Sequence, residues 1–144
     1  MSQQIKTEIV ISASKEKVWT ILTAFEDYPK WNPFIISIEG ELSVGSRLEN
    51  TMMNDGKKFV FKPVVLSVVP NRSFEWLGSL FVKGIFDGHH YFEIVAINSS
   101  QVKLIHGENF NGILSSFILK RIGEQTKKNF ILMNQAIKKL AEVN

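Results

Sequence analysis

The C-terminal stretch Leu114–Leu140, LSSFILKRIGEQTKKNFILMNQAIKKL, determines the fold that we predict for this chain. Its apolar residues recur about every 3.6 positions, which is the period of an amphipathic α-helix. The residues that share this apolar face are Leu114, Phe117, Ile118, Ile122, Phe130, Met133, Ile137 and Leu140. Glu124 and Glu142 lie on the opposite face among Lys and Arg side chains. The pattern predicts one long helix with a single buried face.

The residues that precede this helix form a series of short strands and turns. The pattern predicts six strands, at 34–39, 46–53, 58–69, 73–80, 85–97 and 101–110. Turn residues at hairpin spacing separate them, at Gly45, 54–56, 70–71 and 98–100. Because short links join consecutive strands, we expect an antiparallel meander.

The N-terminal part adds one strand and two short helices. Residues 5–12 alternate between apolar and polar side chains, as in a half-buried strand. Ser14 is the expected N-cap of a helix that ends near Thr23, and Asp27 ahead of Pro29 suits the first turn of a second helix. The order β-α-α-β6-α predicts an α+β helix-grip fold, in which a curved seven-stranded antiparallel sheet wraps around the C-terminal helix.

The composition is that of one globular domain. The 144 residues are 44% hydrophobic and 22% charged, and no linker or repeat divides them. A chain of this length buries a substantial core without disulfides. We therefore expect a single domain over residues 1–144.

Several partner and site classes are excluded or disfavoured. The absence of cysteine excludes thiol nucleophiles and cysteine-ligated metals. The N-terminus lacks the pattern of a secretion signal, which favours a cytoplasmic protein without stable membrane anchoring. Although the net charge is +3, the basic residues alternate with Glu on the outer helix face, so we expect no nucleic-acid partner. We expect a monomer or a weak homodimer.

Five segments, together with the order of elements, resemble the SRPBCC superfamily of START-like and Bet v 1-like proteins. The resemblance is strongest to its bacterial polyketide cyclase/dehydrase branch and covers essentially the whole chain. The segments are Val18-Trp19, 28–34 (YPKWNPF), 90–93 (HYFE), 106–112 (HGENFNG) and 133–138 (MNQAIK). The resemblance implies an interior hydrophobic pocket. It implies no shared catalytic set, because members include lipid carriers, aromatic-ring cyclases and hormone receptors.

Three polar side chains fall on inward faces of the predicted strands. His90 shares a face with Phe92, whereas His89 points the other way, and His106 and Glu108 share the apolar face of the last strand. Three interpretations remain open for this set. They are structural hydrogen bonding, anchoring of a ligand, and general acid/base catalysis with His106 or His90 as proton carrier and Glu108 as its orienter.

Other residues are candidates for the wall of the pocket. Trp31 is expected near its mouth, and Asn50 and Met52 add a polar and a deformable contact. The aromatic candidates are Phe59, Phe61, Trp76, Phe92, Phe110 and Phe117. We expect no metal and no cofactor, because His106, Glu108 and His90 lack the spacing of a metal motif and no phosphate-binding glycine loop is present.

The sequence therefore predicts a protein that binds a small hydrophobic molecule such as a lipid, an isoprenoid or an aromatic metabolite. One alternative is a cofactor-independent polyketide cyclase/dehydratase-type enzyme that uses His/Glu acid-base chemistry. A second alternative is a protein-interaction module that uses the Trp31 region or the basic helix face.

Overall fold

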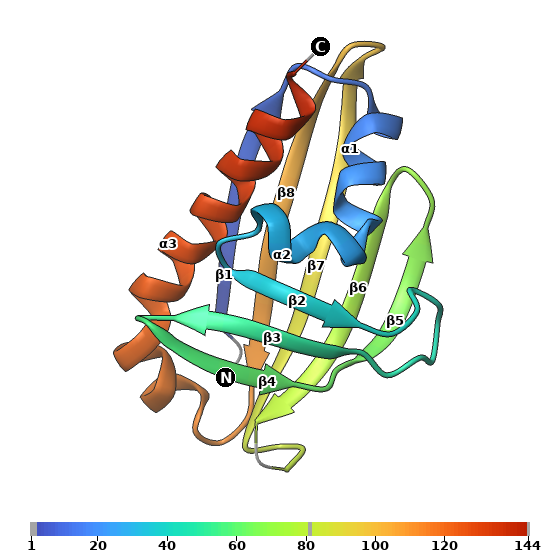
Figure 1. Ribbon diagram of the computed structural model, residues 1–144. Helices are drawn as coiled ribbons and strands as arrows, with labels where there is room; N and C mark the ends of the chain where they lie inside the picture. Colours follow the sequence, from blue (N-terminus) through green and yellow to red (C-terminus); the bar gives the residue numbers. More distant parts are fainter. Residues whose placement is uncertain (1–2, 81, 144) are drawn as a thin grey trace.

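Eight strands and three α-helices make up the computed structural model, which describes residues 3–80 and 82–143 (Figure 1). The strands are β1 Gln3–Ile11, β2 Ile35–Glu39, β3 Glu49–Asn54, β4 Lys57–Phe61, β5 Val64–Val69, β6 Ser73–Leu80, β7 Phe86–Asn98 and β8 Gln101–Asn111. The α-helices are α1 Lys15–Thr23, α2 Tyr28–Trp31 and α3 Ser115–Ala141, and a 3-10 turn, Phe25–Asp27, lies between α1 and α2. No helix in these described ranges has the length and hydrophobicity needed to cross a membrane.

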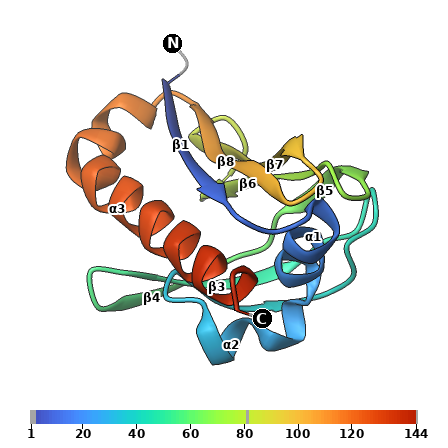
Figure 2. The same ribbon diagram turned by 90° about the horizontal axis from the view of Figure 1, so that it is seen from above.

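The strands form two antiparallel sheets that face each other across the interior. The larger sheet has the order β1-β8-β7-β6-β5, and the smaller has the order β2-β3-β4. Figure 1 shows the smaller sheet crossing in front of the larger one, and Figure 2 shows α3 along the side that the two sheets leave open. This arrangement confirms the predicted α+β helix-grip fold.

The prediction of one strand over residues 58–69 is wrong, because the structure has two strands there, β4 and β5. Pro63 lies between the two strands and has no N–H to donate to a sheet, while its carbonyl accepts a hydrogen bond from Leu48 N at 2.8 Å. The chain passes there from the smaller sheet to the larger one. The structure therefore has eight strands in two sheets, where the sequence predicted seven strands in one.

The apolar face of α3 is buried over only part of its length. Phe130, Met133 and Ile137 are fully buried, as predicted. At the two ends, however, Leu114, Phe117 and Leu140 are exposed by 40%, 57% and 39%. The periodicity assumes a helix that lies on the strands throughout, whereas Figures 1 and 2 show its first turns standing away from them. Ile118, Ile122 and Thr126 of this half of the helix line a cavity.

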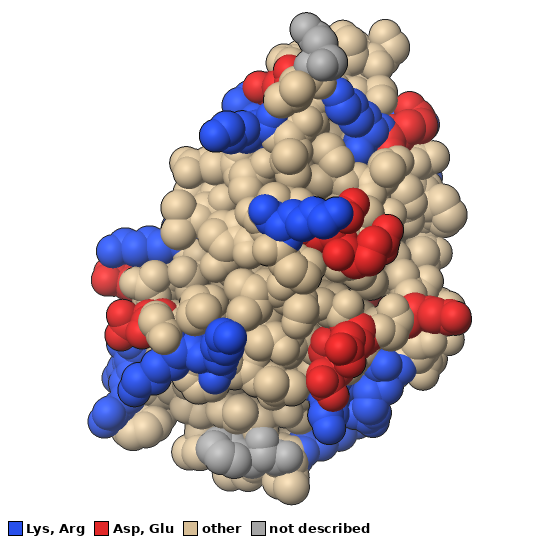
Figure 3. Space-filling model, in the orientation of Figure 1, with Lys and Arg blue, Asp and Glu red and all other residues tan. Residues whose placement is uncertain are grey.

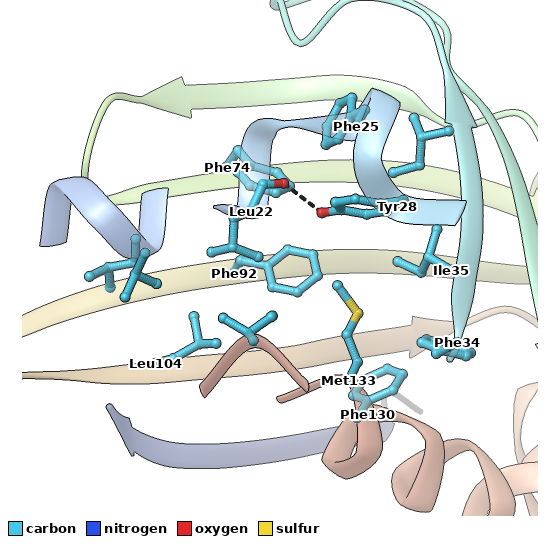
Figure 4. Packing of buried hydrophobic residues seen from close by; sticks show 14 of the residues in the cluster. Leu22, Phe25, Tyr28, Phe34, Ile35, Phe74, Phe92, Leu104, Phe130 and Met133 are labelled. Atoms are coloured by element: carbon cyan, nitrogen blue, oxygen red, sulfur yellow. Dashed lines mark hydrogen bonds between the residues drawn. The ribbon is translucent and has the colours of Figure 1, made fainter. Parts of the chain in front are cut away.

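The opposite end of the interior is filled by aromatic packing under α1 and α2. Ser14 caps α1 as predicted, since its side chain accepts a hydrogen bond from Lys17 N at 3.2 Å. Tyr28 is fully buried, and its hydroxyl donates to the carbonyl of Leu22 at 2.5 Å (Figure 4). The rings of Phe74 and Phe92 pack behind it with centroids 5.0 Å apart. This packing fills the interior under α1 and α2.

Candidate functional site

A cavity of about 250 Å³ lies between the smaller sheet, strands β6 to β8 and the first half of α3. Its wall is mostly aromatic and aliphatic. The aromatic residues are Phe34, Phe59, Phe61, Trp76, Phe86 and Phe110. The polar residues are Asn50, Asn54, His90, Glu108 and Thr126. A concave apolar site with few polar groups is the usual form of a small-molecule site.

Eight of the twelve side chains that the sequence predicted for the pocket line this cavity. They are Asn50, Met52, Phe59, Phe61, Trp76, His90, Glu108 and Phe110. They come from five different strands, so the fold brings together residues that are far apart in the chain. The two sheets contribute opposite walls.

The other four predicted residues lie elsewhere, and each for a physical reason. Phe92 and His106 do point inward, but they lie within the packed core, with exposed fractions of 1% and 0%. Phe117 lies on the outside of α3, where the guanidinium of Arg121 covers its ring at 4.7 Å. Trp31 borders a separate, shallower depression beside α1 and α2, because its ring packs against Tyr28.

Sequence reasoning also missed part of the wall. Ile118 and Ile122 were predicted as core-facing residues of the helix, and they face the cavity instead. Gly78 of β6 and Gly88 of β7 pair directly with each other, and both line the cavity. A glycine carries no side-chain pattern, so alternation along a strand cannot identify it as part of a site.

A chain of polar side chains crosses the interior from β1 to the cavity wall. The hydroxyl of Thr7 donates to the carbonyl of His106 at 2.7 Å, and the amide of Asn134 donates to Thr7 Oγ1 at 2.8 Å. Asn134 Oδ1 contacts His106 Nδ1 at 2.8 Å, and His106 Nε2 contacts His90 Nε2 at 2.8 Å. The polar residues are thus connected through the core.

The chain ends at Glu108, the acidic residue on the cavity wall. His90 Nδ1 lies 3.3 Å from Glu108 Oε1, and the Glu108 side chain is only 16% exposed. His90 therefore lies between His106 and Glu108, so the two side chains that share a face of β8 are connected through His90. His89 lies on the other face of β7, where its ring contacts Glu75 at 3.0 Å, as the strand alternation predicted.

Burial determines the charge of the innermost histidine. Desolvation, together with the neighbouring His90, lowers the pKa of His106 well below its usual range, although the hydrogen bond to Asn134 opposes this shift. His106 is therefore neutral in the folded protein. This position does not suit it as the proton carrier, because His90 separates it from the cavity.

Gly88 creates the space in which the Glu108 carboxylate lies. A Cβ atom added to Gly88 would come within 2.1 Å of Glu108 Oε2, which is closer than any real contact. At the paired position, a Cβ on Gly78 would meet only the Pro63 side chain, at 3.4 Å. A side chain at position 88 would therefore displace the carboxylate, whereas one at 78 would not.

The side-chain oxygen of Asn50 is a buried polar atom without a protein partner. The residue is 1% exposed, and its Oδ1 accepts no hydrogen bond from the part of the chain that the structure describes. A buried acceptor without a donor costs about 1–3 kcal/mol of stability. Residues 3–80 and 82–143 contain no group of three His, Asp or Glu side chains arranged to hold a metal ion.

Comparison with known proteins agrees with the fold. A family model described as "Polyketide cyclase / dehydrase and lipid transport" matches residues 2–115. No curated protein matches the chain in sequence.

Several solved structures share the fold at low sequence identity. The Zhui aromatase/cyclase from Streptomyces sp. R1128 has a TM-score of 0.80 at 14% identity, over 99% of this chain and 94% of that chain. Norcoclaurine synthase from Thalictrum flavum, in complex with dopamine and hydroxybenzaldehyde, has a TM-score of 0.74 at 15% identity, over 97% and 86%. A START superfamily protein from Mycobacterium smegmatis has a TM-score of 0.73 at 19% identity, over 96% and 97%.

Proposed function

The chain belongs to the polyketide cyclase/dehydrase and lipid transport family, and from this premise we propose that it binds a small hydrophobic molecule in the interior cavity. The observation that carries the proposal is the aromatic wall around open volume. Protein interiors are normally close-packed, so an unfilled space of about 250 Å³ lined by Phe and Trp rings loses packing that a ligand would restore.

The size of the cavity favours a compact ligand. Sites for drug-sized molecules usually have volumes of about 300–1,000 Å³, and this cavity lies just below that range. An aromatic molecule of one or two rings, or a short isoprenoid, fits this volume better than a long-chain lipid. Small aromatic ligands in the norcoclaurine synthase complex support the same size class.

The surface supports a small molecule as the partner and does not favour nucleic acid. Figure 3 shows acidic and basic side chains interspersed on one face of the molecule. On α3, Lys138 forms an ion pair with Glu142 at 2.5 Å. Paired charges of this kind weaken contact with a phosphate backbone. We therefore propose a small molecule, bound within a single domain and without a cofactor, as the partner of this protein.

Native mass spectrometry and thermal shift test this proposal. We expect a ligand from a library of aromatic and isoprenoid compounds to bind with one-to-one stoichiometry and to raise the melting temperature of the protein. Ile122→Trp fills the cavity from α3 and should abolish this gain, while Ile131→Trp, on the exposed side of the same helix, should preserve it. If no library member binds, or if Ile122→Trp binds as well as the wild type, the proposal is wrong.

Acid/base catalysis is a second candidate, favoured by the Glu108 and His90 pair at the cavity wall. A carboxylate beside an imidazole in an apolar site can move a proton in a cyclisation or dehydration. Positioned acids and bases contribute about 10²–10⁴-fold to such rates. Turnover of a polyketide-type precursor should therefore fall about a hundredfold or more in Glu108→Gln and stay unchanged in Glu93→Gln, on the outer face of β7. Equal turnover in both variants would exclude this role.

A further inference from the structure

We propose that the ligand of this cavity carries a hydroxyl or ammonium group, and that this group donates a hydrogen bond to Oε2 of Glu108. The inference rests on the proposed function and deepens it, because it names the chemistry of the ligand's polar end. It follows from the contacts of the buried chain from Thr7 to Glu108 and from the oxygen of Glu108 that this chain leaves free.

The direction begins at Thr7, which has a single hydroxyl hydrogen. A carbonyl oxygen can only accept, so Thr7 must donate this hydrogen to His106 O, at 2.7 Å. Thr7 Oγ1 therefore accepts from Asn134, and the atom of Asn134 that lies 2.8 Å away must be its NH₂ nitrogen. The amide is thereby fixed with its oxygen toward His106.

The oxygen of Asn134 in turn fixes the tautomer of His106. Asn134 Oδ1 only accepts, so His106 Nδ1 must carry a hydrogen at the 2.8 Å contact. His106 is neutral because burial disfavours its charged form. Its Nε2 therefore has a lone pair, which accepts from Nε2–H of His90 at 2.8 Å.

His90 also approaches the carboxyl group of Glu108, because its Nδ1 lies 3.3 Å from Oε1. Oε1 is therefore the oxygen of Glu108 that faces the buried chain. The second oxygen, Oε2, keeps its lone pairs free.

That second oxygen is the atom offered to the ligand. Oε2 lies against Gly88, which lines the cavity, and no described residue donates a hydrogen bond to it. Glu108 Oε2 is thus an unpartnered acceptor on the wall, so a complementary ligand supplies a donor.

The first test reads the hydrogen positions directly in the ligand-free protein. Nitrogen-15 NMR of the histidine side chains should show His106 as the Nδ1–H tautomer and His90 with a hydrogen on Nε2. Finding the hydrogen of His106 on Nε2 would reverse the chain and overturn the tautomers assigned here, and the binding test below decides the chemistry of the ligand. This arm does not depend on any ligand.

The second test compares 2-naphthol with 2-methoxynaphthalene by calorimetry. The two probes share a two-ring body, but methylation removes the donor from the second. The wild type should bind 2-naphthol about tenfold more tightly, as expected for one additional hydrogen bond. Glu108→Met should lose this preference, while Glu93→Met, which removes a carboxylate from the outer face of β7, should retain it.

Each result of the binding test is decisive. Equal affinity of the two probes for the wild type, or an unchanged preference in Glu108→Met, overturns this inference and leaves the proposed function standing. Binding of neither probe overturns both. If Glu108→Met does not fold, Gly88→Ala serves in its place, because its Cβ displaces the same carboxylate and should reduce the preference for 2-naphthol.

Discussion

The Nε2 atoms of His90 and His106 lie 2.8 Å apart on the neighbouring strands β7 and β8. Two imidazoles at this distance share one hydrogen, so they cannot both be charged without strong repulsion. His90 faces the cavity and His106 faces the core. This contact links the candidate ligand site to the packed interior, and the following predictions depend on it or on the packing around it.

His106 should stay neutral when the solution becomes mildly acidic. Its pKa is held well below the usual value of about 6.5, first by burial and then by His90. In the unfolded chain His106 takes up a proton below about pH 6.5, whereas in the folded chain it does not. Above about pH 6.5 both states are neutral at this residue, and the stability that neutral His106 gives the folded protein is fully present. As the pH falls below about 6.5, the free energy of unfolding decreases by up to about 1.4 kcal/mol per pH unit.

A nitrogen-15 NMR titration of the His106 ring measures this directly. We expect its shifts to remain those of a neutral imidazole across the range in which a peptide histidine titrates. A midpoint near that of a peptide histidine would show that the pKa is not depressed and would contradict the prediction.

Asn134→Leu should destabilise the fold by about 2 kcal/mol or more. Asn134 is 2% exposed, and leucine of similar size would leave the Nδ1–H of His106 without an acceptor in the core. Urea denaturation checks this, with the exposed neighbour Gln135→Leu as the matched control, whose change should stay within about 0.5 kcal/mol. Equal stability of the two variants would mean that the buried chain contributes nothing to the fold.

Gly88→Ala should weaken binding in the cavity, whereas Gly78→Ala should not. The two glycines are paired across β6 and β7 and both line the cavity, but only the Cβ at position 88 would collide with Glu108. Calorimetry with 2-naphthol should show about a tenfold loss of affinity for Gly88→Ala alone. A similar loss in both variants would indicate a general effect of side chains on the cavity volume.

Tyr28→Phe should lower the free energy of unfolding by about 1–3 kcal/mol. The substitution leaves the Leu22 carbonyl without its donor in a fully buried place, and burial also raises the pKa of this hydroxyl. Tyr91→Phe on the outer face of β7 is the control and should change stability by less than about 0.5 kcal/mol. The measurement is urea denaturation, and a Tyr28→Phe protein as stable as its control would refute the proposed role of the hydroxyl.

The fold could be predicted from the sequence because apolar residues recur regularly over the whole length of its main helix and strands. The 3.6-residue period of α3 and the alternation of β1, β6 and β7 fix which faces are buried. The break at Pro63 was missed because the apolar residues on both sides of it read as one continuous strand. Only the position of the second sheet explains why the chain must change direction there.

The site could be predicted only in part, because alternation gives the face of a residue and not its depth. His90 and His106 share the inward side, yet one reaches the cavity and the other the core. Their contact depends on the register of β7 and β8, which shifts between Ala96 and Asn98 at the end of the hairpin. Such an irregularity cannot be read from residue types, so the order Glu108, His90, His106 emerges only from the structure.

The central claim is that a small hydrophobic molecule binds inside the cavity, and methyl NMR with 2-naphthol tests it most directly. Labelled methyl groups of Met52, Ile118 and Ile122 line the cavity, while those of Met133 and Ile137 lie in the packed core. We predict saturable shifts and probe contacts at the first three methyl groups and little change at the other two. Shifts confined to exposed methyl groups such as that of Ile113, or no saturable shift at all, would contradict the claim.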